Sequence, residues 1–321
     1  MSKRSFLGTT GLVLSAALVS ACGGGDDDPD IVELAQDRGG FSALLAAAEK
    51  AGLADELADD SAALTVFAPT DGAFAALATQ LGFADATAMV SALPASALAS
   101  ILSYHVLPSE KKAAALVAGG ATQGTLYSFD GSAATVAVDA TSGVKLTDGA
   151  LTTATVTSAD LDARNGVVHA IDKVLVPPGV LNVVQMAQVN PAFSSLVGAV
   201  TQAGLAGTLS GVGPFTVFAP VNSAFAAIAG VVGGLSNTQL QTVLTYHVVG
   251  GTVLSSAIPF GQPVATVAGQ PITITAGPVP AIASITDTTA TPAKVVAVDV
   301  RASNGVIHVI DKVLLPALGA D

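Results

Sequence analysis

The sequence predicts an α+β protein made of two tandem domains, each a β-sandwich or wedge capped by helices. Three motifs carry this prediction, because each occurs twice and in the same order. The repeated segments are 65–74 with 216–225, 104–106 with 246–248, and 165–177 with 304–316. The offset between copies shrinks from 151 to 142 to 139 residues. Since solenoid repeats have periods of only about 20–50 residues, the pattern indicates a duplicated domain with shortened loops.

Each domain begins with helices. Segments 31–36 and 41–45 in the first copy align with 183–188 and 193–197 in the second, and all have apolar residues at helical spacing. The first domain therefore spans 30–177 and the second 180–316, with 317–321 as a C-terminal tail. Only Pro177-Pro178-Gly179 lies at the join. A join so short and rich in proline should restrict how the domains are arranged.

A short strand and two helices follow the opening helices. Segment 65–68 is β-branched and aromatic and stops at Pro69, which predicts a strand ending there. Thr70 or Asp71, and Asn222 in the second copy, are expected to cap the next helix. Segments 96–104 and 238–246 predict a helix that leads into the Tyr-His pair.

Strands fill the second half of each domain. We expect them at 135–138, 144–146 and 151–156 in the first copy, and at 271–275 and 294–300 in the second. Asn-Gly at 165–166 and 304–305 predicts a hairpin turn, because both turn positions favour positive φ. Each turn leads into an alternating strand, over 167–176 and 306–315.

Taken together, these motifs resemble the fasciclin-like (FAS1) domain pattern. The pattern reads Thr-Val-Phe-Ala-Pro-x-[Asp/Asn]-x-Ala-Phe, then Tyr-His, then Asn-Gly-Val-[Val/Ile]-His-x-Ile-Asp-Lys-Val-Leu-x-Pro. The resemblance implies a helix-capped β-wedge and a secreted or surface-anchored protein of adhesion and matrix binding. The first copy departs from the pattern at Asp71 and Gly72, and the second at Val221.

The motif residues are interpreted as structural. They are Thr65, Phe67, Pro69, Asp71, Phe74, Tyr104, His105, Asn165, Gly166, His169, Asp172, Thr216, Phe218, Pro220, Asn222, Phe225, Tyr246, His247, Asn304, Gly305, His308 and Asp311.

All four histidines lie in these motifs, which raises the question of a His–Asp or metal site. Three residues separate His169 from Asp172, and His308 from Asp311, and an odd separation on a strand places side chains on opposite faces. A transition metal needs about three or four convergent ligands. Histidines flanked by Val and Ile are more often buried, with ring nitrogens bonded to backbone or carboxylate groups. We interpret them as core residues; metal binding, catalysis and a pH switch are the alternatives.

Composition excludes several classes of function. The net charge of -12 argues against a nucleic-acid partner, which needs clustered Lys and Arg. The sequence contains no His-Glu-x-x-His, Gly-x-Ser-x-Gly or Gly-x-x-x-x-Gly-Lys motif. With no Trp and only 4% aromatic residues, a sugar-stacking platform is not expected. We therefore predict a binding protein and no enzyme, with no catalytic residue, metal or cofactor.

The N-terminal segment predicts export. Lys3 and Arg4 precede an apolar run over 7–19, which is typical of a signal peptide. The single cysteine, Cys22, follows Val-Ser-Ala and resembles the bacterial lipobox. Residues 1–21 are then a leader, and 22–29 a lipidated flexible tether of Gly and Asp. By resemblance to sorting rules, glycine at position 23 favours the outer membrane.

The function predicted from these features is adhesion, or contact with extracellular matrix or biofilm, from the cell envelope. The membrane would be reached through the lipid at Cys22, and the ligand would be an extracellular protein or polysaccharide that the sequence does not identify. Two alternatives remain open. One is an envelope enzyme or accessory factor acting on an extracellular polymer, and the other is a structural envelope spacer. The sequence leaves the oligomeric state open as well.

Overall fold

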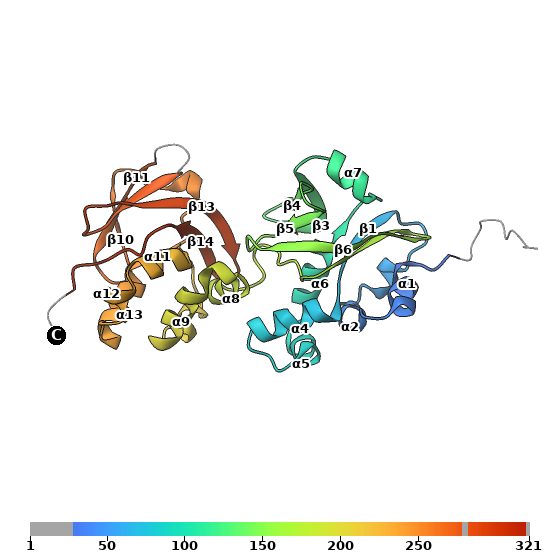
Figure 1. The fold of residues 1–321 in the computed structure, drawn as a ribbon, viewed down its shortest axis with the longest axis horizontal. Helices are drawn as coiled ribbons and strands as arrows, with labels where there is room; N and C mark the ends of the chain where they lie inside the picture. The colour runs from blue at the N-terminus through green and yellow to red at the C-terminus, as the bar shows by residue number, and fades with distance from the viewer. Residues whose placement is uncertain (1–27, 278–281, 319–321) are drawn as a thin grey trace, which may run out of the picture.

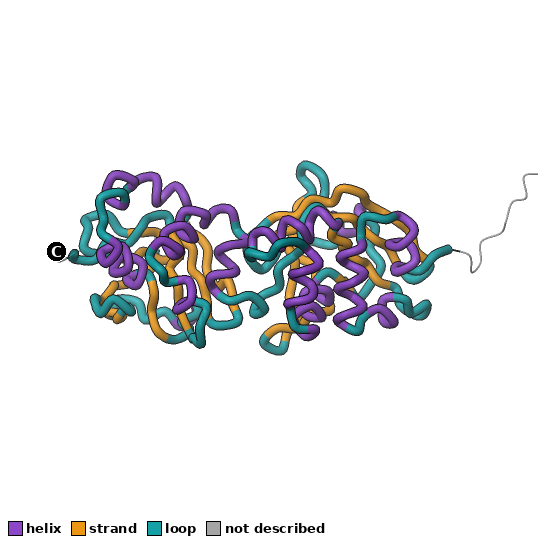
Figure 2. Tube along the Cα trace, turned by 90° about the horizontal axis from the view of Figure 1, so that it is seen from below, coloured by secondary structure: helices purple, strands orange, loops and turns teal. Residues whose placement is uncertain are grey.

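The computed structural model describes residues 28–277 and 282–318 as two lobes in a row, with the described N- and C-terminal ends at opposite ends of the molecule (Figures 1 and 2). The expected leader (1–21), Cys22 and most of the tether (22–29) lie outside the described residues. So do positions 319–321 of the expected tail.

The first lobe contains seven helices and seven strands among the described residues. The helices are α1 (Ile31–Arg38), α2 (Ser42–Ala51), α3 (Ala54–Leu57), α4 (Asp71–Gln80), α5 (Ala86–Ala92), α6 (Ala95–Tyr104) and α7 (Ala113–Ala118). The strands are β1 (Leu64–Pro69), β2 (Val106–Leu107), β3 (Thr122–Phe129), β4 (Ser132–Asp139), β5 (Lys145–Thr147), β6 (Thr153–Ala163) and β7 (Gly166–Ile171).

The second lobe repeats this order with changes in the loops. Its helices are α8 (Val183–Val189), η1 (Pro191–Phe193), α9 (Ser194–Gln202), α10 (Ala206–Leu209), α11 (Asn222–Ala227), α12 (Ala229–Val232), α13 (Asn237–Tyr246) and η2 (Ser255–Ala257). Its strands are β8 (Phe215–Pro220), β9 (Val248–Gly250), β10 (Pro263–Ala265), β11 (Pro271–Ala276), β12 (Ala283–Thr286), β13 (Ala293–Ala302) and β14 (Gly305–Ile310).

Each lobe is built around one curved seven-stranded sheet. The strand order is β2-β1-β7-β6-β5-β4-β3 in the first lobe and β10-β11-β12-β13-β14-β8-β9 in the second. The pairs β1–β7 and β8–β14 are parallel, and the other pairs are antiparallel. Most helices cover one side of each sheet, whereas α7 lies on the opposite side of the first sheet (Figure 1). This matches the expected α+β class, with helices capping a wedge of strands.

The sheets have apolar packing on both faces. Val168 and Ala170 of β7 face the helices, whereas Ile171 belongs to a second cluster enclosed by the strands, together with Phe67 and Tyr104. Every residue of β7 and of β14 is therefore buried. Fully burying one such large apolar side chain contributes roughly 1.5–3 kcal/mol. The prediction of long alternating strands over 167–176 and 306–315 was wrong, since both strands are shorter and covered on both faces.

The hairpins form where the Asn-Gly pairs predict them, but the turn lies one residue earlier than expected. Ala163 pairs with Gly166, so the two-residue loop is Arg164-Asn165 and Gly166 already belongs to β7. Asn165 does not have positive φ. The same shift occurs in the second lobe, where Ala302 pairs with Gly305. Strands β2, β3, β9, β10 and β12 were missing from the sequence-based prediction.

Helix capping confirms Thr70, one of the two residues expected to cap α4, and corrects the expectation for Asn222, since the N-cap of α11 is Val221. Thr70 caps α4 by accepting a hydrogen bond from Ala73 N–H at 3.3 Å. Asp71 instead accepts bonds from Ala43 N–H and from the Ser42 hydroxyl, both at 2.8 Å, at the start of α2. Asn222 likewise accepts from Ser195 N–H at the start of α9, at 2.9 Å. Each Asx side chain therefore ties two helices together, because it satisfies the free N–H groups of a neighbouring helix.

Direct contacts bridge the two lobes on both sides of the proline-rich join. Asn190 Nδ2 donates to Ala150 O at 2.9 Å. The guanidinium of Arg301 lies over the ring of Phe129, 5.1 Å from its centroid, and 2.8 Å from a carboxylate oxygen of Asp130. One continuous apolar cluster includes residues of the helical faces of both lobes. The two lobes thus share packing as well as the covalent join.

Candidate functional site

The Tyr-His motif lies at the end of the helix that crosses beneath each sheet. The ring of Tyr104 is fully buried, and its hydroxyl donates to Thr135 O at 2.8 Å. In the second lobe, Tyr246 donates to Pro271 O at 3.1 Å. The next residue in each copy is a buried histidine at the helix C-cap. The motif thus places two buried polar side chains at the junction of helix and sheet.

Each of these histidines joins its own helix to the segment that follows the last strand of the domain. His105 Nδ1 is 2.7 Å from Ile101 O, and its Nε2 accepts from Leu175 N–H at 2.8 Å. His247 repeats this arrangement with Val243 O at 2.8 Å and Leu314 N–H at 2.8 Å. One nitrogen must donate and the other must accept, so these partners assign the neutral Nδ1–H tautomer to both rings.

The second histidine of each domain lies on the central strand, in the opposite tautomer. His169 Nε2 is 2.9 Å from Lys111 O, and its Nδ1 accepts from Asp160 N–H at 3.2 Å. Its ring stacks on Phe67, with centroids 5.8 Å apart. His308 does the same with Val253 O at 2.8 Å and with Asp299 N–H at 3.3 Å. Asp160 and Asp299 have positive φ at irregularities in β6 and β13, and this local geometry turns their N–H groups toward the rings.

Burial keeps the rings of His105, His247 and His308 neutral. It lowers the pKa of His105 and of His247 to about 4, although the bonds to Ile101 O and Val243 O act in the other direction. Burial also lowers the pKa of His308. A neutral ring with both nitrogens engaged has no free lone pair for a metal or a proton transfer. The expectation that these rings are buried and bonded to backbone groups agrees with the structure.

The Asn-Gly pair fastens the first helix of each domain to the sheet. Asn165 Oδ1 accepts from Ile31 N–H at 3.0 Å, and its Nδ2 donates to Leu57 O at 2.8 Å. Asn304 makes the equivalent bonds in the second lobe. A Cβ on Gly166 would lie 2.1 Å from Leu64 O, and a Cβ on Gly305 would lie 2.1 Å from Phe215 O. The glycines are therefore required by the close approach of the parallel partner strand.

The remaining polar motif residues also bond to backbone groups. Thr65 donates to Ser109 O at 2.7 Å and accepts from Lys111 N–H at 2.8 Å. Asp172 accepts from Thr155 N–H at 2.6 Å, and Asp311 accepts from Lys294 N–H at 2.7 Å. His169 and Asp172 thus have separate partners, as their odd spacing predicts. Within residues 28–277 and 282–318, no group of three or more His, Cys, Asp or Glu side chains is arranged to hold a metal ion.

The largest open pocket among the described cavities lies where the lobes meet. It has a volume of about 580 Å³ and is lined by Phe129 and Gly179 on one side and by Arg301 and the β13–β14 hairpin on the other. Val212 on its rim is fully exposed. No acidic side chain lines it. We call this pocket the junction crevice. Sequence reasoning missed it, because its two walls come from segments that no motif links.

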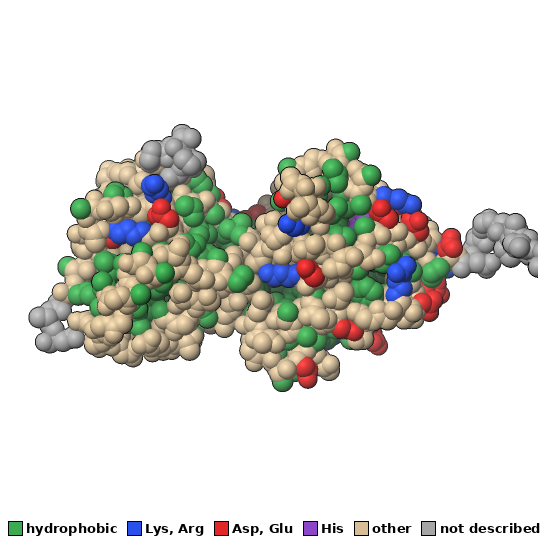
Figure 3. Space-filling view, viewed as in Figure 1, with side chains coloured by type: hydrophobic (Ala, Val, Ile, Leu, Met, Phe, Trp, Pro, Cys, Tyr) green, Lys and Arg blue, Asp and Glu red, His purple; other side chains and the backbone are tan. Residues whose placement is uncertain are grey.

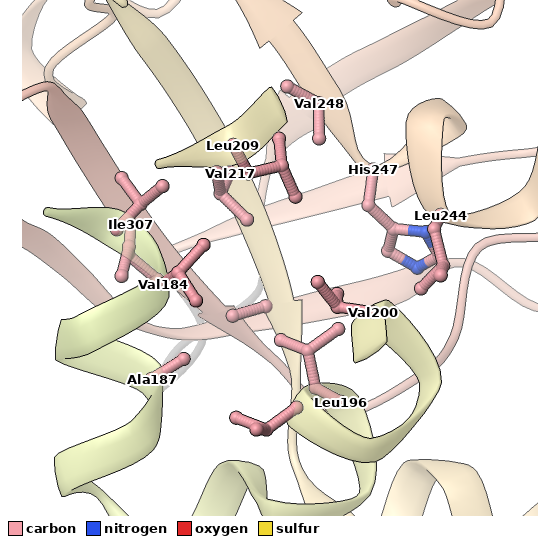
Figure 4. Close-up of a pocket in the computed structure, with 13 residues that line it drawn as sticks. Val184, Ala187, Leu196, Val200, Leu209, Val217, Leu244, His247, Val248 and Ile307 are labelled. Carbon is pink, nitrogen blue, oxygen red and sulfur yellow. The ribbon is translucent and has the colours of Figure 1, made fainter. Parts of the chain in front are cut away.

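A small apolar cavity recurs in both lobes beneath the first helix. In the second lobe it measures about 40 Å³, and side chains of α8, α9 and the central strands point into it (Figure 4). The cavity at the equivalent place in the first lobe measures about 30 Å³. Both are far smaller than the roughly 150 Å³ apolar cavity that holds benzene. We interpret them as packing gaps.

Charge is distributed unequally over the surface. Acidic side chains gather at the N-terminal end of the first lobe, whereas the second lobe shows few charges on the visible face (Figure 3). The sequence between residues 33 and 180 carries 16 acidic and 7 basic residues, and that between 181 and 321 carries 4 and 3. In the part of the chain that the structure describes, no single helix is long and apolar enough to cross a membrane.

Comparison with known proteins identifies the class to which this fold and these motifs belong. The fasciclin domain model matches residues 39–177 and 191–316. The chain therefore belongs to the fasciclin domain family, as a tandem pair. This agrees with the resemblance carried by the repeated motifs.

Individual relatives come from bacteria, fungi and animals. Protein sll1483 of Synechocystis sp. is 43% identical over 43% of this chain and 75% of its own length. The fasciclin-like arabinogalactan protein elcF of Phaeosphaeria nodorum is 30% identical over 78% of each chain. Among solved structures, a FAS1 domain pair from the insect cell adhesion molecule fasciclin I covers 89% of this chain and 95% of its own, with 18% identity and a TM-score of 0.43.

Proposed function

We propose that this protein mediates adhesion or matrix contact from the cell envelope, by binding and without catalysis. One observation carries the proposal: the tyrosine hydroxyls, the histidine rings and the Asn-Gly amides that the two domains share are bonded to backbone within each domain. His105, His169 and their counterparts in the second lobe have both ring nitrogens engaged. Residues common to both copies therefore support folding, and binding falls to surfaces where the copies differ.

The junction crevice is the surface that best suits a ligand. Clefts at domain boundaries are frequent binding sites, and this one combines the apolar Val212 and Phe129 with the hydroxyl of Thr252 and the guanidinium of Arg301. It is present only when both domains are joined. This supports a ligand that contacts the pair and not one isolated domain.

Gene deletion followed by measurement of attachment and biofilm mass tests the proposed role. Loss of attachment that the wild-type gene restores is the expected result. A variant carrying Val212→Glu at the crevice rim should restore attachment poorly, because it adds a charge to an exposed apolar rim. A matched control, Val231→Glu on exposed α12, should restore it fully. Unchanged attachment after deletion, on all surfaces tested, would reject the adhesion role.

We also propose that the protein is held in the envelope by lipid on Cys22. The support is the apolar run over 7–19 followed by Val-Ser-Ala-Cys, with a Gly and Asp spacer after it. Cys22→Ala should move the protein from the membrane fraction to the soluble fraction. Mass spectrometry of the wild-type N-terminus should find an acylated cysteine. An unmodified Cys22 within an uncut leader would reject the anchor and leave the adhesion proposal standing.

A further inference from the structure

The duplication allows polar groups at the junction to be compared with their counterparts in the second lobe. A buried carboxylate in each domain accepts the backbone N–H of the residue three positions after the motif lysine. Asp148 accepts from Val176 at 3.0 Å, and Asp287 accepts from Leu315 at 2.9 Å. In the first lobe this bond holds the chain immediately before Pro177. The first copy of the arrangement therefore lies at the join between domains.

The two lysines differ in their partners. Lys312 Nζ lies 2.9 and 3.1 Å from the carboxylate oxygens of Asp287, and it also contacts the Thr289 hydroxyl. Its counterpart, Lys173, makes no ion pair with Asp148. Lys173 Nζ instead lies 3.5 Å from the carbonyl of Val189, the last residue of α8 in the other lobe. The carbonyl end of a helix attracts cations, so this lysine connects the first domain to the second.

As a result, the junction holds a buried carboxylate without a cation. Asp148 is bonded only to neutral donors, namely the N–H groups of Ala150, Thr152 and Val176 and the hydroxyl of Thr152. Burial raises its pKa, and these bonds and the charge of Lys173 only partly oppose the effect. Burial likewise lowers the pKa of Lys173, against the attraction of Asp148 and Asp172.

In the second lobe the pKa of the equivalent carboxylate, Asp287, shifts in the opposite direction. Burial acts to raise the pKa of Asp287 as well, but bonds from Thr289, Leu315 and Lys312 together bring it below its usual value. The second lobe thus shows that the same backbone geometry allows an ion pair between the motif lysine and the buried carboxylate. In the first lobe, Lys173 contacts the end of α8 and makes no ion pair with Asp148.

We propose that Lys173 exchanges partners and that this exchange changes the arrangement of the two domains. In the clasped arrangement, described here, its ammonium lies at the end of α8. In the released arrangement it pairs with Asp148, as Lys312 pairs with Asp287, and α8 is freed. The junction crevice lies at the same boundary between the lobes, where Gly179 N–H donates to Arg301 O at 3.0 Å.

The pH dependence of the exchange follows from the two partners of Lys173, because Asp148 can bind a proton and the carbonyl of Val189 cannot. The titratable groups that face Asp148 are Lys173 and Tyr104, with Asp172 beside the lysine and His105 behind Leu175. The clasped arrangement leaves Asp148 without a cation, so it binds a proton more tightly than the released arrangement does. Lowering the pH therefore favours the clasped arrangement. Acid below the pKa of His105, about 4, is avoided because it would break the bond to Leu175.

Distances between spin labels on the two lobes test the exchange. The labels are placed through Ala75→Cys on α4 and Thr238→Cys on α13, both exposed, in the full chain with Cys22→Ser. We expect two distances at about pH 7 and a several-fold lower released fraction at about pH 5. Asp148→Asn should leave only the clasped distance at both pH values. Lys173→Met removes both partnerships and should give a broad distribution that does not change with pH.

The matched control is Lys312→Met in the second lobe. It should lower the unfolding temperature of that lobe and leave the wild-type distances unchanged. Lys173 is only half-buried, so Lys173→Met should fold, and circular dichroism checks this for each variant. A single distance that is unaffected by pH, by Asp148→Asn and by Lys173→Met would overturn the proposal. So would an equal response to Lys312→Met.

Discussion

The two domains share their interior and differ at their ends. The buried tyrosine, both histidines and the Asn-Gly hairpin have the same bonding pattern in each copy. The hairpin turn itself diverges. In the first copy it carries Arg164, which lies 2.5 Å from Asp60 and 3.2 Å from Asp30. In the second copy Ser303 occupies this place, and the turn borders the junction crevice.

This comparison separates two roles for the duplicated sequence. What was retained in both copies satisfies buried backbone groups, and losing a partner there is costly. What changed is the hairpin turn, which contacts Asp28 and Asp30 in the first domain and borders the junction crevice in the second. The four predictions below test this division, from the largest expected effect to the smallest.

The close approach of parallel strands should make the hairpin glycines the most sensitive positions. Gly166→Ala and Gly305→Ala each place a methyl group against a backbone carbonyl that cannot move without breaking the sheet. We expect each change to destabilise its own domain by about 3 kcal/mol or more. Denaturant unfolding followed by domain-resolved hydrogen exchange measures this.

Gly198→Ala in α9 is the matched control. A Cβ there meets nothing within 4 Å, so the change should be neutral or stabilising by up to about 1 kcal/mol. If Gly305→Ala were tolerated while Gly166→Ala was not, the close approach of the parallel partner strand would not limit both sheets in the same way.

His105 and His247 should contribute almost equally to the stability of their respective domains. His105→Leu leaves Leu175 N–H and Ile101 O buried without partners, and His247→Leu does the same to Leu314 and Val243. We expect a loss of about 2–3 kcal/mol for each. A variant that abolished turnover of an extracellular polymer at unchanged stability would contradict this structural role and favour an enzyme.

Acid should affect the two domains differently through Asp148 and Asp287. The folded pKa of Asp287 is lowered, so its contribution to stability is present above the unfolded pKa and is lost as the pH falls through the folded value. The folded pKa of Asp148 is raised, so its ionisation costs stability as the pH rises through that value. His105 and His247 each have a pKa of about 4, so their contributions cancel in the comparison.

Hydrogen exchange of each domain across acidic pH measures this difference. Between wild type and Asp287→Asn, the second domain should lose part of its acid sensitivity. Asp148→Asn should instead make the first domain relatively more stable near neutral pH. Equal acid profiles for both domains in the wild type would contradict the assigned asymmetry.

The smallest effect is expected at the exposed turn of the first domain. Arg164→Ala removes ion pairs with Asp30, Glu33 and Asp60, but the arginine side chain is 31% exposed and its Glu33 and Asp60 partners are more exposed still. Surface pairs of this kind contribute little to the free energy of unfolding, and salt screens them. Thermal unfolding at low and high salt should show a small loss that disappears with salt. Lys112→Ala, which breaks the exposed pair with Asp162, provides the matched comparison.

Sequence patterns predicted the elements that depend on short-range signals. The Tyr-His helix, the strand before Pro69 and the hairpin positions follow from periodicity and turn residues, and the structure has them close to the predicted bounds. Strand length does not explain which strands were missed, because β3 has eight residues and was missed, whereas the three-residue β5 was predicted. Of the two candidate caps in the first lobe, Thr70 is the cap, and the role of Asn222 was misassigned. Asp71 and Asn222 have their partners on another helix, 28 and 27 residues away in sequence.

The sequence by itself determined the duplication, the family, the buried motif residues and the uneven charge, because each depends on residue identity and spacing alone. Tertiary structure decided which groups meet. The partner of each histidine nitrogen, the junction crevice and the different environments of Lys173 and Lys312 all depend on segments far apart in the chain. Two lysines in the same motif have different partners because Lys173 lies beside α8 of the second lobe, whereas Lys312 lies beside Asp287 of its own lobe.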